Sequence, residues 1–265
     1  MAGIFALPVV GMPIFEPGMS IAREVFSGLA SEAANKVDHA AETLRDGDVC
    51  VVAQKIVSKA EGRLVSLAQV TPSDEAKNIA AQTQRDAAMI QLILDESSAI
   101  LRAVPPAIIA RHLTGHVLAN AGIDASNVSA DNGDTVLLWP RDPDASARAI
   151  RKELRQISGA SPAVLIADSM GRAWRIGTVG NAIGCAGLTV LDDQRGIGKD
   201  LFGRTLQATV IAVADAIAGI ATLAMGEGDE RTPAAIVRGA DRWVTKDDGP
   251  GAASGLRPVA EDMFR

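Results

Sequence analysis

The chain has 265 residues, enough for one large domain or two small ones with a sizeable core. Hydrophobic residues make up 48% of the chain and charged residues 22%, an ordinary globular profile that excludes a disordered chain. The formal net charge of −6 argues against a general nucleic-acid binder. Tyrosine is absent and other aromatic residues are scarce, which also argues against a stacking platform for single-stranded nucleic acid.

The apolar stretches favour a protein of the cytoplasm that crosses no membrane. The start of the chain is apolar, but it lacks a basic segment and prolines interrupt it, so we do not interpret it as a signal peptide. Asp215 lies near the middle of the apolar stretch 206–226, which therefore predicts a buried helix rather than a membrane span. Cys50 and Cys185 lie in apolar contexts, which favours buried free thiols over a disulfide.

The first third of the chain predicts two helices and a strand. Small and charged residues alternate over 21–44 in a helical pattern, and a turn at 45–48 follows. The run 49–57 is rich in β-branched residues and predicts a strand. Residues 71–84 predict a helix, because Ser73 can cap its start and acidic residues occupy its first turn.

The middle of the chain alternates between helix and strand. Residues 89–103 predict an amphipathic helix that ends before Pro105. Residues 115–124 predict a strand with a glycine-bearing loop, and residues 135–140 predict a strand that ends at Pro140.

A well-marked helix and a core strand follow. Residues 142–159 begin with acidic residues, become basic and end at a glycine, which are the signals of a helix. The apolar run 162–168 predicts a strand. Because strands and helices do not alternate strictly, we predict an α+β (mixed α/β) fold. We expect one domain over residues 1–245, with the alternative of two intertwined subdomains, and a loose C-terminal tail over 246–265.

Neither standard phosphate-binding loop is present. The segment "GIGKD" has the Gly-Lys pair of a P-loop, but Asp200 follows it and Asp193 stands where the earlier glycine is required. The dinucleotide fingerprint also fails, because Leu201 stands at the third glycine position. A nucleotide site in this chain must therefore be of a non-standard kind.

Two segments carry polar residues next to predicted strands. Asp124 can offer a hard oxygen to Mg²⁺ or Mn²⁺, and Asn127 can donate to a phosphate or hold a base. The alternative is a turn in which these side chains cap their own backbone. Lys55 and Lys59, expected near the end of a strand, can neutralise a polyphosphate. The alternative there is a pair of solvated edge-strand lysines.

The segment "ADSMGRAWRIG" is the strongest local signal. Asp168, expected at a strand terminus, is suited to a metal ion, and Ser169 can add a hydroxyl oxygen. Arg172 and Arg175 can clamp phosphate or carboxylate oxygens. The alternative is a glycine-rich turn with surface arginines.

Acidic residues also cluster after the long apolar helix, in "MGEGDERTP". Glu227, Asp229 and Glu230 oppose the helix dipole, and a bound cation would relieve that repulsion. The alternative is a solvated acidic loop. The histidines lack a zinc-ligand pattern; they are His39, His112 and His116.

Several segments in one order resemble the coenzyme F420-0:L-glutamate ligase family, also called the F420 gamma-glutamyl ligase family. They include "QKIVSKAEGR", "ANAGIDASNV", "LLWPRDPDASARAIRKEL", "ADSMGRAWRIGTVGNAIGCAG", "RGIGKDLFGR" and "MGEGDERTPAAIVRG". The resemblance covers residues 5–239. One departure is Met19-Ser20, where the family often has two aspartates, so helix capping or a substrate contact differs here.

The resemblance implies a ligase that depends on GTP and on two divalent ions, Mg²⁺ or Mn²⁺, with K⁺ as a further ion. Such an enzyme adds L-glutamate to coenzyme F420-0, and then further gamma-linked glutamates, through an acyl phosphate. The resemblance also implies an intertwined, two-lobed homodimer with active sites near the interface. The alternatives are a related carboxylate–amine ligase with another substrate and a non-catalytic GTP-binding homologue.

The resemblance also assigns site residues. The metal ligands would be Asp124, Asp168, Ser169 and Glu227. Asp168, Arg172 and Arg175 would be catalytic. The residues contacting GTP would be Met12, Pro13, Ile14, Phe15, Gln54, Lys55, Lys59, Asn127, Met225, Gly226, Glu227, Gly228, Asp229, Glu230, Arg231 and Thr232.

Overall fold

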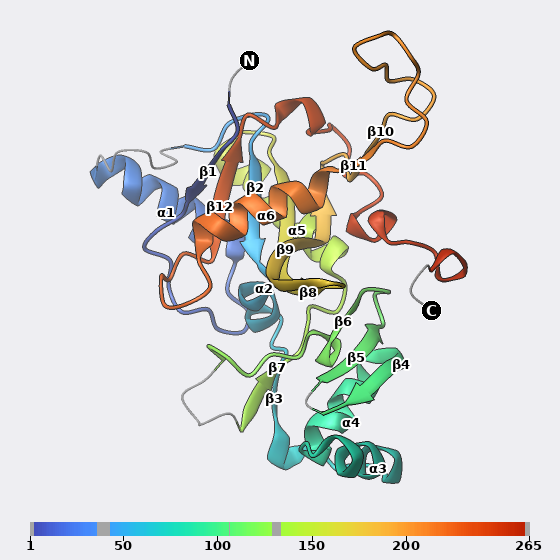
Figure 1. The fold of residues 1–265 in the computed structure, drawn as a ribbon. Helices are drawn as coiled ribbons and strands as arrows, with labels where there is room; N and C mark the ends of the chain where they lie inside the picture. Colours follow the sequence, from blue (N-terminus) through green and yellow to red (C-terminus); the bar gives the residue numbers. More distant parts are fainter. Residues whose placement is uncertain (1–2, 36–42, 106, 129–133, 263–265) are drawn as a thin grey trace.

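The computed structural model describes residues 3–35, 43–105, 107–128 and 134–262. Its centre is a five-stranded sheet with the order β1-β12-β2-β8-β9 (Figure 1). The strands of this sheet are β1 (Phe5–Pro8), β12 (Ala234–Arg238), β2 (Val49–Ala53), β8 (Ala163–Arg172) and β9 (Arg175–Ala186). Only the β2–β8 pair is parallel, and the other neighbours in the sheet are antiparallel.

Helices cover both faces of this sheet, which explains the continuous apolar runs of β2 and β8. Alternate residues of β2 enter opposite cores: Cys50 packs on one side and Val51 on the other. The first core contains α1 (Ile21–Asn35) and α5 (Pro143–Ser158), and the second contains α6 (Val213–Met225). Cys50 and Cys185 are buried free thiols, as predicted.

The helix predicted over 142–159 is confirmed as α5. Asp142 Oδ1 accepts a hydrogen bond from the Ala145 amide at 2.9 Å, and Gly159 ends the helix with a φ of 73°. The helix predicted over 21–44 is shorter, because α1 ends at Asn35 and residues 36–42 lie outside the described residues. Ser20 Oγ accepts from the Arg23 amide at 3.2 Å, so this residue caps α1 at the position where the sequence departs from the family.

The C-terminal tail, predicted to be loose over 246–265, contacts the body of the molecule at Asp248 and Ala252. Arg151, a fully buried residue of α5, donates to Asp248 Oδ1 at 2.7 Å and to the Thr245 carbonyl oxygen at 2.5 Å. Ala252 is also buried. A buried guanidinium requires partners for its donors, and this segment supplies them.

A second group of elements has a core of its own, and lies below the main sheet in Figure 1. It consists of α3 (Asp74–Thr83), α4 (Ala87–Asp95) and a sheet of β4 (Ser97–Val104), β5 (Ala107–His112) and β6 (Val117–Ala119). Ser73 Oγ caps α3 by accepting from the Ala76 amide at 3.2 Å, as predicted. The helix predicted over 89–103 is wrong in its second half, because the chain from Ser97 pairs with β5 as strand β4.

Short elements complete the fold. They are α2 (Gln54–Ala60), the strand pair β3 (Leu64–Ser66) and β7 (Thr135–Leu137), and the 3₁₀ helices η1 (Leu67–Gln69), η2 (Asn120–Gly122), η3 (Asp241–Trp243), η4 (Ala252–Gly255) and η5 (Val259–Glu261). The strand predicted over 49–57 ends at Ala53, where α2 begins.

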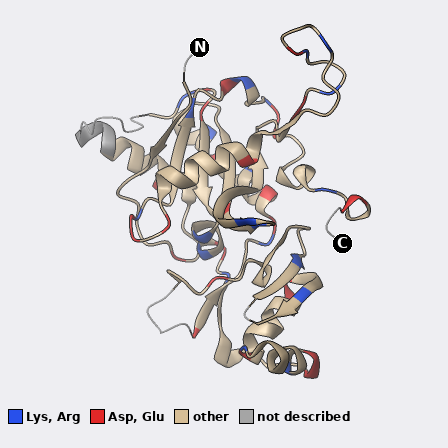
Figure 2. Cartoon of the chain, viewed as in Figure 1, with Lys and Arg blue, Asp and Glu red and all other residues tan. Residues whose placement is uncertain are grey.

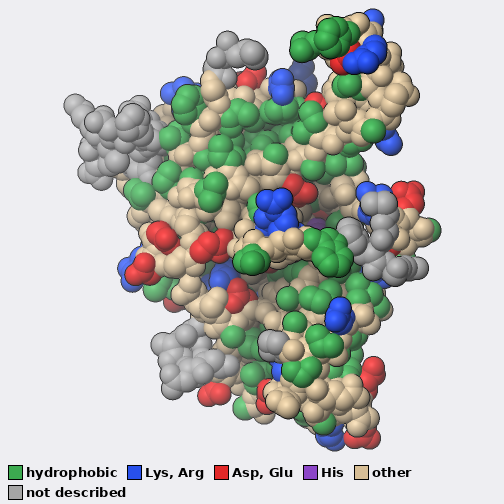
Figure 3. All heavy atoms as spheres, in the orientation of Figure 1, with side chains coloured by type: hydrophobic (Ala, Val, Ile, Leu, Met, Phe, Trp, Pro, Cys, Tyr) green, Lys and Arg blue, Asp and Glu red, His purple; other side chains and the backbone are tan. Residues whose placement is uncertain are grey.

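Residues 191–212 form an arm that projects from the body of the molecule (Figure 1). At its base, β10 (Leu191–Asp193) pairs with β11 (Val210–Ala212). At its outer end Leu201 is 100% exposed and Phe202 is 83% exposed, and Figure 3 shows hydrophobic side chains gathered there. A soluble monomer rarely leaves such large apolar side chains uncovered together.

The fold is thus mixed α+β, as predicted. Among the described residues, no helix has both the length and the apolar character that crossing a membrane requires.

Candidate functional site

One cavity of ≈ 760 Å³ is lined by side chains from five distant parts of the chain. They are the turn before α1, helix α2, the loop after η2, strand β8 and the loop after α6. Every residue that the resemblance assigns to GTP lines this cavity: Met12, Pro13, Ile14, Phe15, Gln54, Lys55, Lys59, Asn127, Met225, Gly226, Glu227, Gly228, Asp229, Glu230, Arg231 and Thr232. Asp168 and Ser169 line it as well.

Helix α2 presents two lysines to the cavity. The sequence prediction placed Lys55 and Lys59 near the end of a strand. Strand β2 ends at Ala53, and both lysines lie in the helix that follows it directly. The helical spacing of four residues puts both ammonium groups on one face. Figure 2 shows Lys and Arg residues, coloured blue, on this helix. Burial and the neighbouring Lys55 both lower the pKa of Lys59, and Asp124 opposes them.

These lysines are tied to the loop that contains Asp124 and Asn127. Lys55 Nζ lies 2.8 Å from Asp124 Oδ2 and donates to Ser126 Oγ at 3.0 Å. Lys59 Nζ donates to the Asn127 carbonyl oxygen at 2.8 Å. Burial raises the pKa of Asp124, but the hydrogen bonds from Lys55 and Ser126 outweigh burial, so its pKa lies below the ordinary value.

Asp168 lies within strand β8 and not at its end, contrary to the sequence prediction, because β8 continues to Arg172. Its carboxylate accepts from Trp139 Nε1 at 2.8 Å through Oδ2 and from the Ser169 amide at 2.8 Å through Oδ1. The pKa of Asp168 is raised to about 6, because burial, together with the nearby Asp124, outweighs the hydrogen bonds from Trp139 and Ser169 that lower it. Of the described residues, no Lys or Arg forms an ion pair with this carboxylate.

The loop after α6 closes another side of the cavity. Ser169 donates a very short hydrogen bond from Oγ to Glu227 Oε1. Asn127 Nδ2 donates to the Gly228 carbonyl oxygen at 3.2 Å, and the Gly228 amide donates to Glu230 Oε2 at 2.7 Å. The loop is therefore held both by its own residues and by the residues that face it.

Of the predicted metal ligands, Asp168, Ser169 and Glu227 line the cavity, and Asp124 is not among its lining residues. Ser169 contacts Glu227, while Asp124 is paired with Lys55. In the part of the chain that the structure describes, no group of three or more acidic, histidine or cysteine side chains converges closely enough to hold a metal ion. The donors are nevertheless all oxygens, and the half-buried Asp168 has no ion-pair partner among the described residues. This chemistry fits Mg²⁺ or Mn²⁺.

The structure does not bring Arg172 and Arg175 to the cavity. Both lie at the tip of the β8–β9 hairpin, where they are paired with each other across the strands, and both are exposed. Arg172 Nη1 donates to the Gly177 carbonyl oxygen at 3.0 Å. Of the histidines, His39 lies outside the described residues, and His112 and His116 pack against Trp139.

The role of Trp139 was not predicted from the sequence, where this residue was only part of the strand predicted over 135–140. A signal was present, because a buried indole N–H needs an acceptor and this chain has only three tryptophans. Trp139 is fully buried, and its acceptor is the carboxylate with the raised pKa.

Comparisons with known proteins identify the family of the chain. A family model described as F420-0:Gamma-glutamyl ligase matches residues 10–239. The chain is 44% identical over 263 residues to the coenzyme F420:L-glutamate ligase of Methanothermobacter thermautotrophicus, covering 99% of each chain. It is 43% identical to the coenzyme F420:L-glutamate ligase of Haloarcula marismortui, covering 97% of this chain and 94% of that one. The protein of the same name from Methanopyrus kandleri is 44% identical over 84% of this chain and 87% of its own length. With a match over most of its length, the chain belongs to the F420-0:gamma-glutamyl ligase family.

Proposed function

We propose that the protein is a GTP- and divalent-metal-dependent ligase that joins L-glutamate to coenzyme F420-0 and then adds further gamma-linked glutamates. Family membership and the names of its relatives support glutamate ligation. The observation that carries the proposal is the single cavity in which lysines, carboxylates and an apolar turn from distant segments meet. We further propose that the enzyme works in the cytoplasm.

In this proposal GTP occupies the ≈ 760 Å³ cavity, which exceeds the lower limit of typical ligand sites, about 300 Å³. Pro13, Ile14 and Phe15 supply apolar surface for the base. Lys55 and Lys59 supply positive charge for the phosphates. When the triphosphate binds, Lys55 exchanges its contact with Asp124 for a phosphate oxygen, which frees that carboxylate.

Oxygen ligands for the metal ions come from Asp124, Asp168, Ser169 and Glu227. When bound, the divalent ions would neutralise phosphate oxygens and align the phosphoryl group, and K⁺ is a further candidate ion. Asp168 is held for this task by Trp139, which fixes one carboxylate oxygen before any ligand arrives. A preorganised ligand lowers the entropic cost of binding.

The chemistry needs no protein nucleophile. A carboxylate oxygen of F420-0 attacks the γ-phosphorus of GTP, the bond to the β-phosphate bridging oxygen breaks, and GDP leaves. The resulting acyl phosphate has a good leaving group. The amine of L-glutamate attacks the acyl carbon, and the C–O bond breaks with release of phosphate. The two protons that leave the ammonium group pass to a base and to the departing phosphate.

We also propose a homodimer. The arm of residues 191–212 supports this, because its outer end carries apolar side chains that a second copy can cover.

The function is tested by incubating the pure protein with GTP, Mn²⁺, L-glutamate and F420-0 and measuring the mass of the product. We expect a mass increase of one glutamate residue or more and one GDP per amide bond. GTP binding without release of GDP would contradict the proposal and favour the non-catalytic homologue. GTP-dependent ligation of another acid or amine would favour the related ligase.

Asp168→Asn should abolish glutamate incorporation, with a loss of at least about 100-fold. The asparagine can still accept from Trp139, so the fold should persist. Asp192→Asn is the matched control, because Asp192 Oδ2 also accepts from a tryptophan, Trp243 Nε1, at 3.2 Å outside the cavity. Full turnover of Asp168→Asn with metal present would show that the site is wrongly assigned.

A further inference from the structure

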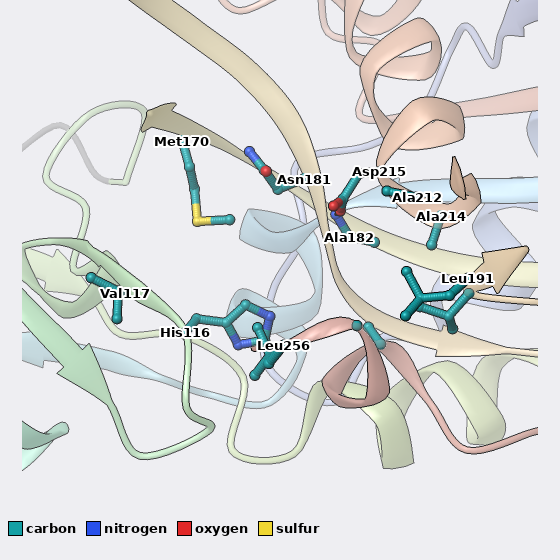
Figure 4. A pocket seen from close by; sticks show the side chains of 13 residues that line it. His116, Val117, Met170, Asn181, Ala182, Leu191, Ala212, Ala214, Asp215 and Leu256 are labelled. Atoms are coloured by element: carbon teal, nitrogen blue, oxygen red, sulfur yellow. The ribbon is translucent and has the colours of Figure 1, made fainter. Parts of the chain in front are cut away.

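A second, smaller pocket lies beside the candidate site, at the free edge of the central sheet. Its volume is ≈ 140 Å³, and Figure 4 shows its lining. Strand β9 is the last strand of the sheet, and the pocket lies between its outer edge, β6, the start of α6 and η4. Asn181, which lines this pocket, is the cross-strand partner of Asp168 in β8. The pocket and the ≈ 760 Å³ cavity therefore share the β8–β9 pair as a wall.

The side chains that line the pocket offer acceptors and no cation. Asp215 Oδ1 accepts from the Ala182 amide at 2.9 Å, which leaves Oδ2 free to accept. Asn181 uses its amide nitrogen to donate to the Val179 carbonyl oxygen at 2.6 Å, which leaves Oδ1 as an acceptor. Neither Lys nor Arg is among the described residues that line it.

His116 is the buried polar group of this pocket. It is 4% exposed, and its Nε2 has no well-aligned hydrogen-bond partner among the described residues, with the Ala182 backbone as a weaker contact. Figure 4 shows its ring directed into the pocket. A buried nitrogen without a partner is costly, and a bound ligand would remove that cost.

The surrounding hydrogen bonds determine which nitrogen of His116 carries the proton. The Thr114 amide donates to His112 Nδ1 at 3.0 Å, so His112 Nδ1 is an acceptor. Thr114 Oγ1 lies 2.9 Å from His112 Nδ1 and 2.9 Å from His116 Nδ1. Two acceptors at this distance would repel, so the hydroxyl donates to His112, and His116 Nδ1 donates to the hydroxyl. His116 Nε2 is therefore the ring nitrogen that carries the lone pair.

We propose that this pocket binds a primary ammonium group, with Asp215 and Asn181 as acceptors and His116 Nε2 as the atom that takes one proton from it. The identification of that group as the amine of L-glutamate rests on the proposed function. Both carboxylates of the glutamate stay at the open mouth, because the lining offers them no cation. A volume of ≈ 140 Å³ suits the amine end of an amino acid and not a nucleotide.

The proton balance follows from this placement. The ammonium group gives one proton to His116 Nε2 and becomes an amine with a free electron pair. That pair forms the C–N bond with the acyl carbon, and the C–O bond breaks toward phosphate. The second nitrogen proton leaves with the phosphate, which gives an amide, hydrogen phosphate and an imidazolium that returns its proton to solvent.

The electrostatics keep His116 neutral and ready to accept a proton. Burial lowers its pKa, and His112 lowers it further. A hydrogen bond from the protonated ring to the Ala182 backbone and the carboxylates of Asp144 and Asp215 oppose these effects, but the pKa stays below its ordinary value. When the bound ammonium group passes a proton to His116, the single positive charge moves from the ligand to the ring, and the pocket gains no second positive charge.

The first test separates amine binding from formation of the acyl phosphate. Asp215→Asn keeps the acceptor for the Ala182 amide but removes the charge, and His116→Asn keeps a donor for Thr114 but removes Nε2. Both variants should raise the KM for L-glutamate by roughly 10- to 100-fold. The rate of hydroxamate formation, with hydroxylamine as a small neutral nucleophile that traps the acyl phosphate, should stay within about twofold of the unmodified protein.

Asp74→Asn is the matched control, because Asp74 is also an acid in the first turn of a helix but lies on α3, far from the pocket in the chain. An unchanged KM for L-glutamate in both variants overturns the proposal. Equal losses of hydroxamate formation and ligation also overturn it, because they indicate a structural role.

The second test does not depend on turnover. The ring ¹⁵N signals of His116 are followed by NMR during titration with L-glutamate and, separately, with glutarate, which has the same carboxylates but no amine. We expect the Nε2 signal to move with glutamate alone. If the unmodified protein makes neither hydroxamate nor product, the proposed function fails, and this titration still decides the pocket. Equal responses to both compounds, or none, contradict it.

Discussion

Trp139 is the residue on which the geometry of the site depends most. Its indole donates to Asp168, and the rings of His112 and His116 lie 5.0 and 5.4 Å from it. On its remaining side is Gly122, whose positive φ of 75° brings the backbone against the indole. The single hydrogen bond to Asp168 thus rests on close packing around the indole.

Gly122→Ala should destabilise the protein by about 3 kcal/mol, because the added Cβ would lie 2.3 Å from Trp139 Nε1 in a strained backbone conformation. Gly159→Ala is the control for strain alone, since Gly159 has a similar φ of 73° and nothing within 4 Å of the added atom. The control should lose about 1 kcal/mol in urea unfolding. Equal losses in the two variants would mean that the contact with Trp139 is unimportant.

Single residues were predictable from the sequence where their chemistry is local. Asp142, Ser73 and Gly159 terminate helices as predicted, because capping depends on neighbours within one turn. The joint position of Lys55 and Asp124 depended on the resemblance, since nothing in either segment specifies the other. The roles of Trp139 and His116 depend on packing between distant elements, which no local pattern contains.

The elements that the sequence misassigned are those whose conformation changes within one apolar run. Residues 49–57 and 89–103 each read as one element, yet each is two in the structure. In the first run Gln54 begins α2, and its Oε1 accepts from Ser58 Oγ at 2.9 Å within the helix. In the second run, pairing with β5 draws the chain from Ser97 onward into a strand. Tertiary pairing overrides weak local propensity in such runs.

One ion pair joins the turn after α2 to the junction of α4 and β4. Arg63 Nη2 lies 2.6 Å from Glu96 Oε2, with side chains 10% and 15% exposed, and Arg63 Nε donates to the Trp139 carbonyl oxygen. Burial raises the pKa of Glu96, but the hydrogen bonds from His112 and Arg63 outweigh burial and hold it below the ordinary value. The pair therefore stabilises the contact between the two groups of elements.

Glu96→Gln should lower the free energy of unfolding by about 2 kcal/mol at pH 7, as expected for a hydrogen bond to a charged group. Because the pKa of Glu96 is lower in the folded protein, its contribution is complete above the unfolded value of 4.5 and is lost as the pH falls through the folded value. The difference between variant and parent in urea unfolding should thus shrink in acid. If the difference in unfolding free energy does not change with pH, the ionised Glu96 carboxylate is not its source.

For the whole molecule, composition and pattern predicted the mixed α+β class, and the motifs in order led to the family. The order of the central sheet was not predictable, because β1 and β12 pair across almost the full length of the chain. The arm was also missed. Residues 206–212 were predicted as the start of a buried helix, but α6 begins only at Val213, and the residues before it are mostly exposed and include strand β11. The rest of the arm was tested only for phosphate loops.

Leu201→Ser combined with Phe202→Ser should shift the protein from dimer to monomer, since the exposed apolar end of the arm is the surface that we expect a second copy to cover. Light scattering after size-exclusion chromatography measures the mass directly. Leu113→Ser, at a position 62% exposed in the hairpin between β5 and β6, is the control and should leave the mass unchanged. If the double variant has the same mass as the parent protein, the arm is not part of the dimer interface.

Arg151 limits how the protein can be shortened for laboratory use. The guanidinium lies under the central sheet with no solvent to compensate its charge, and the acid paired with it belongs to the last eighteen residues. A truncation that removes Asp248 would leave the buried guanidinium without its carboxylate partner, at a cost of about 3 kcal/mol or more. Affinity tags and fusions are therefore better appended to the full C-terminus than used to replace it.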